Sequence, residues 1–181
     1  MRIIAGAWRG RTLVTPSGLA TRPTSERARQ ATFDMLAHAP WAGRSALEDA
    51  VVLDAFAGSG ALGLEALSRG AARAVFMDTS RAALDAIRAN VAACRATAAV
   101  LPADATRPPR ATEPATLVFL DPPYGQALVS RALTALATAG WLATGALLVA
   151  ETGRDEPAPF ANEPLASRTH GAATVWFARF G

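Results

Sequence analysis

Apolar and polar positions follow two different periods along most of this chain. Short apolar runs predict buried strands at about residues 50–55, 73–78, 97–101, 115–120 and 145–151. Between these runs, apolar residues at helical spacing predict helices at about residues 59–69, 80–94 and 125–138. Strands that alternate with helices indicate a parallel sheet with crossover helices. The tail, residues 164–180, predicts a last antiparallel hairpin, which completes an α/β sheet of seven strands.

Two further elements precede this pattern. Residues 1–20 alternate and turn, which predicts a β-hairpin with Gly10 at its tip. Pro23 then signals the start of a helix. We therefore divide the chain into a short hairpin-and-helix extension, residues 1–40, and a main α/β domain, residues 41–181.

The predicted fourth strand ends in Asp121-Pro122-Pro123-Tyr124. Adjacent prolines lack the backbone donors that a central strand needs, so this segment is a rigid turn at the sheet edge, where open α/β folds bind ligands. The turn suits methylation of an amino group on a nucleobase. Asp121 and the Pro122 carbonyl would accept both N–H bonds and free the nitrogen lone pair, while Tyr124 stacks on the extruded base. A plain turn without chemistry explains the same residues equally well.

A glycine-rich loop upstream favours the chemical interpretation. Gly58-Ser59-Gly60 follows the first buried strand and opens a helix, which lets backbone approach a ligand at the helix N-terminus. Asp78 lies 20 residues after Gly58, at the tip of the second strand, where an acid binds ribose hydroxyls. A dinucleotide-dependent oxidoreductase shares both features but has no use for the proline turn. The combination favours a Rossmann-like fold that uses S-adenosylmethionine, with residues 41–181 as the methyltransferase domain.

Individual candidates have alternative roles. Asp54 contacts the methionine amine of the cofactor or holds the glycine loop by hydrogen bonds. Asp104 binds the adenine amino group or caps its own loop, and Phe56 is favoured as a core residue. The candidate catalytic residues are Asp121, Pro122, Pro123 and Tyr124. The candidate cofactor residues are Asp54, Phe56, Ala57, Gly58, Ser59, Gly60, Asp78, Thr79, Asp104, Ala105 and Asp121.

The distribution of charged residues along the chain indicates a possible binding partner. All 18 basic residues are arginine, and six of them lie in residues 1–30 beside a single acid, Glu26. A basic arm on a nearly neutral body is typical of nucleic-acid binding, although a solvated surface patch is equally compatible. The candidate RNA-binding residues are Arg9, Arg11, Arg22, Arg27 and Arg29. Three other charged residues are expected to be solvated: Glu65, Arg69 and Arg73.

Several classes of protein are disfavoured by composition. No apolar run reaches the roughly 18 residues of a membrane span, and no secretory signal is recognisable. The single cysteine, Cys94, excludes an internal disulfide and is expected to be buried or partly buried. No group of residues has metal-ligand spacing, and methyl transfer to nitrogen requires no metal. We expect a cytoplasmic, soluble, monomeric protein with no membrane partner.

Four segments together resemble the RsmD family of 16S ribosomal RNA guanine-N2 methyltransferases: MRIIAGAWRGR, LATRPTSERARQATFDML, LDAFAGSGALGLEALSRGA and LVFLDPPY. The resemblance implies methylation of guanine 966 by S-adenosylmethionine, with 16S rRNA in the small subunit or its assembly intermediate as partner. Two positions depart from the family pattern. After the second strand, family members often have a Glu followed by an aliphatic residue and an acid. This chain has Met77-Asp78-Thr79-Ser80 there, so Asp78 has to be the acid that binds the ribose. Tyr124 stands where many members have Phe.

Two other functions remain open at this point. An adenine-N6 DNA methyltransferase also uses this proline turn, but the chain has no room for a separate target-recognition domain. A non-catalytic RNA-binding module on the same fold would be expected to lose Asp121 or the glycines, and this chain keeps them.

Overall fold

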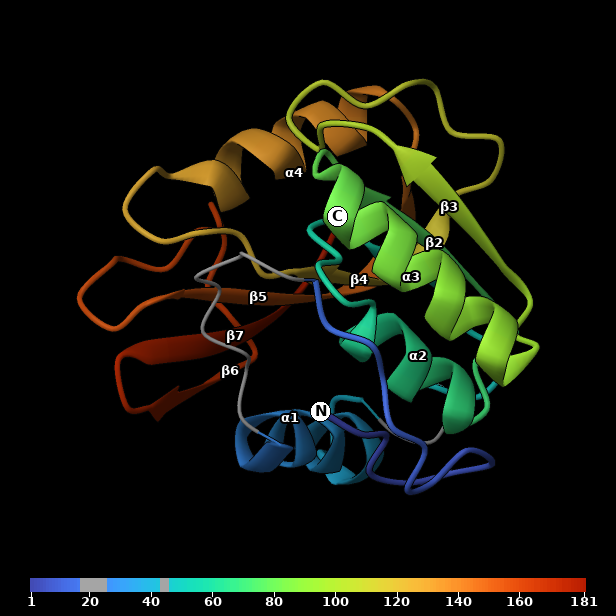
Figure 1. Ribbon diagram of the computed structural model, residues 1–181. Helices are drawn as coiled ribbons and strands as arrows, with labels where there is room; N and C mark the ends of the chain where they lie inside the picture. Colours follow the sequence, from blue (N-terminus) through green and yellow to red (C-terminus); the bar gives the residue numbers. More distant parts are fainter. Residues whose placement is uncertain (17–25, 43–45) are drawn as a thin grey trace.

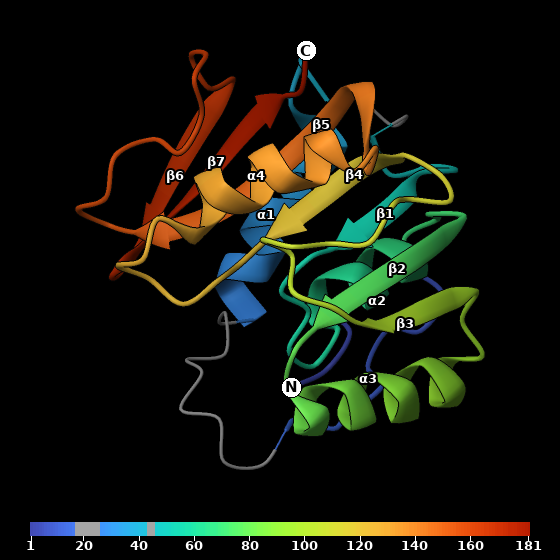
Figure 2. The same cartoon turned by 90° about the horizontal axis from the view of Figure 1, so that it is seen from above.

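The structure of the protein is a computed structural model that describes residues 1–16, 26–42 and 46–181. Its centre is a seven-stranded sheet in the order β3-β2-β1-β4-β5-β7-β6 (Figure 1). The strands β1 to β5 are parallel, and β7 pairs antiparallel with both β5 and β6 (Figure 2). This confirms the predicted fold class. The strands are β1 (Val51–Asp54), β2 (Arg73–Asp78), β3 (Ala98–Pro102), β4 (Ala115–Leu120), β5 (Leu142–Gly153), β6 (Ala166–His170) and β7 (Ala173–Arg179).

Helices cover both faces of this sheet. The helices are α1 (Glu26–His38), α2 (Ala61–Ser68), α3 (Arg81–Cys94) and α4 (Leu128–Thr138). In β4, Phe119 belongs to the core under α1, α2 and α3, whereas Val118 and Leu120 belong to the core under α4. All three side chains are 0% exposed. A strand covered on both faces has little polar alternation, which explains why residues 117–120 of β4 are all apolar.

The strand order reverses between β1 and β4. From β1 the chain moves outward through β2 and β3, then crosses to β4 on the other side. In open α/β sheets the crevice at such a reversal, beyond the carboxyl ends of the strands, is the usual ligand site. The glycine loop follows β1 and the proline turn follows β4, so the fold brings the two predicted motifs to this one crevice.

The N-terminal segment, residues 1–16, differs from the predicted hairpin. Arg2 and Thr12 form one antiparallel bridge, and the N–H of Gly10 donates to the Ile3 carbonyl at 2.9 Å. Gly10 is therefore paired, and the prediction that it forms the tip is wrong. The turn starts earlier because Gly6 (φ 82°) lies against the Ser68 carbonyl oxygen, where an added Cβ would be only 1.7 Å away.

Element boundaries shift by a few residues. The α4 helix starts at Leu128 instead of 125, because Gly125 and Ala127 adopt positive φ. The predicted helix start at Pro23 lies outside the described residues. Cys94 is buried, as predicted. In the part of the chain that the structure describes, no helix is both long and apolar enough to traverse a bilayer.

Candidate active site

The glycine loop is fixed to the end of the neighbouring strand. Gly58 and Gly60 adopt left-handed conformations, with φ of 56° and 77°, and Gly60 caps the N-terminus of α2. The Asp78 carboxylate accepts the N–H of Gly58 at 2.8 Å, and the Met77 carbonyl accepts the N–H of Ala57 at 3.0 Å. A Cβ added to Gly58 would meet no protein atom within 4 Å. The loop therefore presents an open backbone surface at a helix N-terminus, which fits a bound cofactor.

Asp54 lies beneath this loop. It is 1% exposed, and its carboxylate accepts the N–H of Gly63 at 2.9 Å. Burial raises the pKa of Asp54 to about 7, and the hydrogen bond from Gly63 acts in the opposite direction. The carboxylate thus holds the start of α2, which is the loop-holding interpretation of Asp54. Its contact with a cofactor stays a prediction.

Three further candidates follow the strands β1 and β3: Phe56, Asp104 and Ala105. Asp104 accepts hydrogen bonds from the backbone N–H and the hydroxyl of Thr106, both at 2.8 Å. These two bonds hold the pKa of Asp104 below its usual value. The loop-capping interpretation therefore describes its present contacts, and an adenine contact stays a prediction. Phe56 packs against the core under α4, and Ala105 is buried in it.

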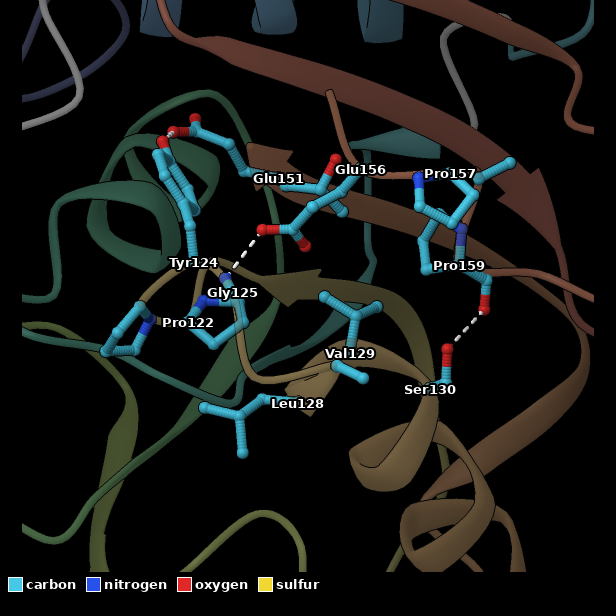
Figure 3. A pocket seen from close by; sticks show the side chains of 14 residues that line it. Pro122, Tyr124, Gly125, Leu128, Val129, Ser130, Glu151, Glu156, Pro157 and Pro159 are labelled. Carbon is cyan, nitrogen blue, oxygen red and sulfur yellow. Dashed lines mark hydrogen bonds between the residues drawn. The ribbon is translucent and has the colours of Figure 1, made fainter. Parts of the chain in front are cut away.

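The proline turn opens onto a pocket of about 250 Å³ (Figure 3). Pro122 is buried, whereas Pro123 and Tyr124 are exposed at its mouth. The Tyr124 hydroxyl donates a hydrogen bond to the carboxylate of Glu151, at the end of β5. The remaining walls come from the start of α4 and from residues 156–159. The pocket is therefore partly apolar and is also lined by the carboxylates Glu151 and Glu156.

Sequence reasoning missed these carboxylates. Glu151 is partly buried, which raises its pKa, while the Tyr124 hydroxyl and nearby His170 act in the opposite direction. Glu156 accepts the N–H of Gly125 at 2.6 Å and thereby holds the turn after Tyr124. A signal was available for Glu151, because it follows a buried strand run in the way that Asp121 follows β4. Among the described residues, no group of three or more His, Cys, Asp or Glu side chains could hold a metal ion.

The predicted RNA-binding arginines differ in their exposure to solvent. Arg9, Arg11 and Arg27 are exposed, and Arg22 lies outside the described residues. Arg29 is 1% exposed, and one of its nitrogens donates to the Arg2 carbonyl at 2.5 Å. The prediction that Arg29 contacts RNA is wrong, because its side chain is enclosed between α1, α2 and the N-terminal segment.

Glu65 is the partner of this buried arginine. Its carboxylate is 0% exposed, lies 3.7 Å from Arg29 and 2.8 Å from Arg69, and accepts the N–H groups of Ile4 and Ala5. The expectation that Glu65 and Arg69 are solvated is wrong. Arg73 is exposed, as expected, and pairs with Glu113. The buried cluster fastens the N-terminal segment to α2.

Comparisons with known proteins agree with this architecture. The model of the family described as conserved hypothetical protein 95 matches residues 1–179. The Ribosomal RNA small subunit methyltransferase D of Escherichia coli K12 is 40% identical over 154 residues, which cover 84% of this chain and 74% of that protein. Its namesake in Haemophilus influenzae is 33% identical, with coverage of 87% and 81%. The solved structure of yhhF from Escherichia coli superposes with a TM-score of 0.83 at 36% identity, covering 99% of this chain and 97% of that one. The chain belongs to the conserved hypothetical protein 95 family, the RsmD family of methyltransferases.

Proposed function

We propose that this protein transfers a methyl group from S-adenosylmethionine to the exocyclic N2 amine of a guanine in 16S ribosomal RNA. The target is guanine 966, in the small ribosomal subunit or its assembly intermediate. The main support is the position of the Asp121–Tyr124 turn at the carboxyl end of β4, directly across the crevice from the glycine loop after β1. A donor site and an acceptor site for an amino group thus lie side by side.

The cofactor site is assigned to the ends of β1, β2 and β3. The backbone of Gly58 and Gly60 would approach the cofactor, and Asp78 would bind its ribose hydroxyls. Asp54 and Asp104 would contact its methionine and adenine ends, and the adjoining candidates Phe56, Ala57, Ser59, Thr79 and Ala105 complete the site. When bound, S-adenosylmethionine supplies a methyl group made electrophilic by its sulfonium.

The acceptor residues hold the guanine amine. Asp121 and the Pro122 carbonyl accept its two N–H bonds, which places the nitrogen lone pair in line for attack and stabilises the positive charge that develops on nitrogen. The surplus proton leaves after transfer, to Asp121 or to water, so a tuned base is unnecessary. The Tyr124 ring stacks on the base, and Pro123 keeps the turn rigid.

The RNA substrate is supported by the relatives. The Escherichia coli and Haemophilus influenzae proteins are both named small-subunit ribosomal RNA methyltransferases, and this chain matches most of their length. A ribosomal substrate would place the enzyme in the cytoplasm. The exposed arginines of the N-terminal segment provide positive charge for RNA phosphates.

Replacing Asp121 with Ala tests the assignment. Small subunits that lack the modification are incubated with enzyme and labelled cofactor, and the RNA nucleosides are analysed by mass spectrometry. The wild type should form N2-methylguanosine at one site. Asp121→Ala should lower turnover by at least about 100-fold, the typical cost of losing a group that stabilises developing charge. The variant should still bind cofactor, which calorimetry measures.

The control is Asp155→Ala, which removes an exposed carboxylate that does not line the pocket. Its turnover should match the wild type. Near-normal turnover of Asp121→Ala would refute the catalytic assignment. Methyladenosine formed in duplex DNA would favour the adenine-N6 alternative, and absence of cofactor binding would favour a non-catalytic RNA-binding module.

A further inference from the structure

Glu151 lies beside the acceptor turn in the sheet. Leu120 of β4 pairs in register with Ala150 of β5, so Glu151 follows Ala150 as Asp121 follows Leu120. Figure 3 shows the Glu151 carboxylate at the Tyr124 hydroxyl, and both residues line the pocket together with Pro122. Two carboxylates therefore occupy adjacent positions on neighbouring strands, Asp121 directly after β4 and Glu151 near the end of β5.

The hydrogen-bonding edge of guanine explains why two are useful. A base removed from its helix is recognised along its Watson–Crick edge. On guanine this edge has the N2 amine and, next to it, the N1–H, and both are donors. Asp121 and the Pro122 carbonyl use the amine hydrogens, which leaves N1–H in need of an acceptor. An ionised carboxylate only accepts hydrogen bonds. Adenine has a lone pair at N1, which would face such a carboxylate without a proton between them.

We propose that Glu151 selects guanine by accepting its N1–H, and that the Tyr124 hydroxyl occupies this acceptor until the base enters. This inference rests on the proposed function and adds a residue that determines specificity. When the base binds, the Tyr124 hydroxyl exchanges with N1–H on the Glu151 carboxylate. The tyrosine ring, which is 37% exposed, can then turn onto the face of the base.

The surroundings of Glu151 strengthen this selection. The side chain is partly buried, so its carboxylate is partly desolvated. A partly desolvated carboxylate loses more free energy when it lacks a hydrogen-bond donor than a carboxylate in water does. A base without N1–H would leave the acceptor unpaired, and sites of this type reject such analogues strongly.

Glu156 provides a matched comparison in the same pocket. Its carboxylate accepts the backbone N–H of Gly125 at 2.6 Å, so it holds the loop between β4 and α4. Glu156→Gln removes one negative charge from the pocket, as Glu151→Gln does. Of these two glutamates, only Glu151 is assigned to the base. The two variants therefore separate base selection from loop positioning and from pocket charge.

The test uses small subunits in which the target guanine is replaced by 2-aminopurine. This base keeps the 2-amino group but has a lone pair at N1. Wild-type enzyme should prefer guanine over 2-aminopurine by about 100-fold or more in kcat/KM for methyl transfer. In Glu151→Gln the side-chain amide can donate to the N1 lone pair of 2-aminopurine. We expect kcat/KM for guanine to fall by about 10- to 100-fold and the preference to fall below about tenfold.

Glu156→Gln should lower both reactions by a similar factor and keep the preference of the wild type. An unchanged preference in Glu151→Gln would overturn the inference while the proposed function stands. Wild-type enzyme that forms N2-methylguanosine but uses 2-aminopurine equally well would overturn it too, whether or not the variants fold. Formation of N6-methyladenosine instead would overturn both the inference and the proposed function.

Discussion

Asp54 is an acid whose folded environment favours its protonated form. Burial raises its pKa to about 7, whereas an unfolded aspartate titrates near pH 3.9. Between about pH 4 and 7 the folded protein therefore binds a proton that the unfolded chain does not. The stability contributed by this group is complete below about pH 4 and is lost as the pH rises to about 7.

Asp54→Asn tests this dependence. The asparagine keeps an oxygen that can accept the N–H of Gly63, but it does not titrate. We expect the difference in unfolding free energy between wild type and variant to change by about 1 kcal/mol per pH unit between about pH 5 and 7, with the wild type losing stability as pH rises. Urea titrations at matched ionic strength measure it. Parallel stability profiles for the two proteins would show that Asp54 is ionised throughout this range.

Local chemistry decides which residues can be predicted from the sequence. The glycine loop and the proline turn have backbone requirements that few other residues satisfy, so their positions could be predicted from the chain alone. Arg29 and Glu65 could not, because their burial depends on coverage by the N-terminal segment, about 60 positions from Glu65 in the sequence. Glu151 likewise contacts Tyr124 across 27 positions. Charged residues follow the usual expectation of exposure unless a distant segment encloses them.

In this chain, strands are easier to predict from the sequence than turns. Residues 74–77 of β2 and 117–120 of β4 are mostly buried, and the sequence shows them as short continuous apolar segments. Gly6 and Gly10 both adopt positive φ, and the contact of Gly6 with Ser68 places the turn earlier than the sequence predicts. A glycine marks a possible turn, and tertiary packing determines which of several glycines forms it.

The packing of α2 on β2 depends on Gly63. A Cβ at this position would lie 2.4 Å from Cε1 of Phe76, a side chain that is 0% exposed. We expect Gly63→Ala to lower the unfolding free energy by about 1–3 kcal/mol, despite the better helix propensity of alanine. Urea unfolding measures this loss. Calorimetry should also show weaker cofactor binding, because α2 begins at the glycine loop.

Phe76→Leu supplies the control for this prediction. Leucine has no atoms in place of Cε1 and Cζ, the two phenylalanine atoms nearest to the added methyl group. The unfolding free energy of the double variant should therefore exceed the value expected from adding the two single effects, by about 1 kcal/mol or more. Strict additivity would mean that the Gly63 substitution acts through the helix backbone and not through this contact.

At the scale of the whole molecule, the N-terminal segment extends along α2 and α3 (Figure 1). At one end, the Ser59 hydroxyl contacts the Met1 sulfur at the glycine loop, and the N–H of Val14 donates to Asn90 of α3. At the other end, the N–H of Trp8 donates to Ser68, the last residue of α2. The exposed Arg9 therefore lies away from the crevice. RNA that contacts it has to extend along the α2 and α3 side of the protein.

This path yields the last prediction. Each phosphate contact adds affinity that depends on salt and not on sequence. Replacing Arg9 and Arg11 together with alanine should weaken RNA binding and reduce the slope of log K against log salt by about 1 to 2, as the loss of two contacts requires. Fluorescence anisotropy with a 16S fragment at several salt concentrations measures the slope. Cofactor affinity should be unchanged, because neither residue is assigned to the cofactor site.

The control removes two exposed arginines elsewhere. Arg73 begins β2, and Arg110 follows Pro109, whose carbonyl accepts the indole N–H of Trp141 just before β5. Both lie at the edge where the strands begin, opposite the crevice. Arg73→Ala with Arg110→Ala changes the net charge by the same amount, so long-range attraction falls equally in the two double variants. A salt slope reduced in the Arg9 and Arg11 variant alone would locate RNA on the N-terminal segment. Equal slopes would mean that these arginines are ordinary surface charge.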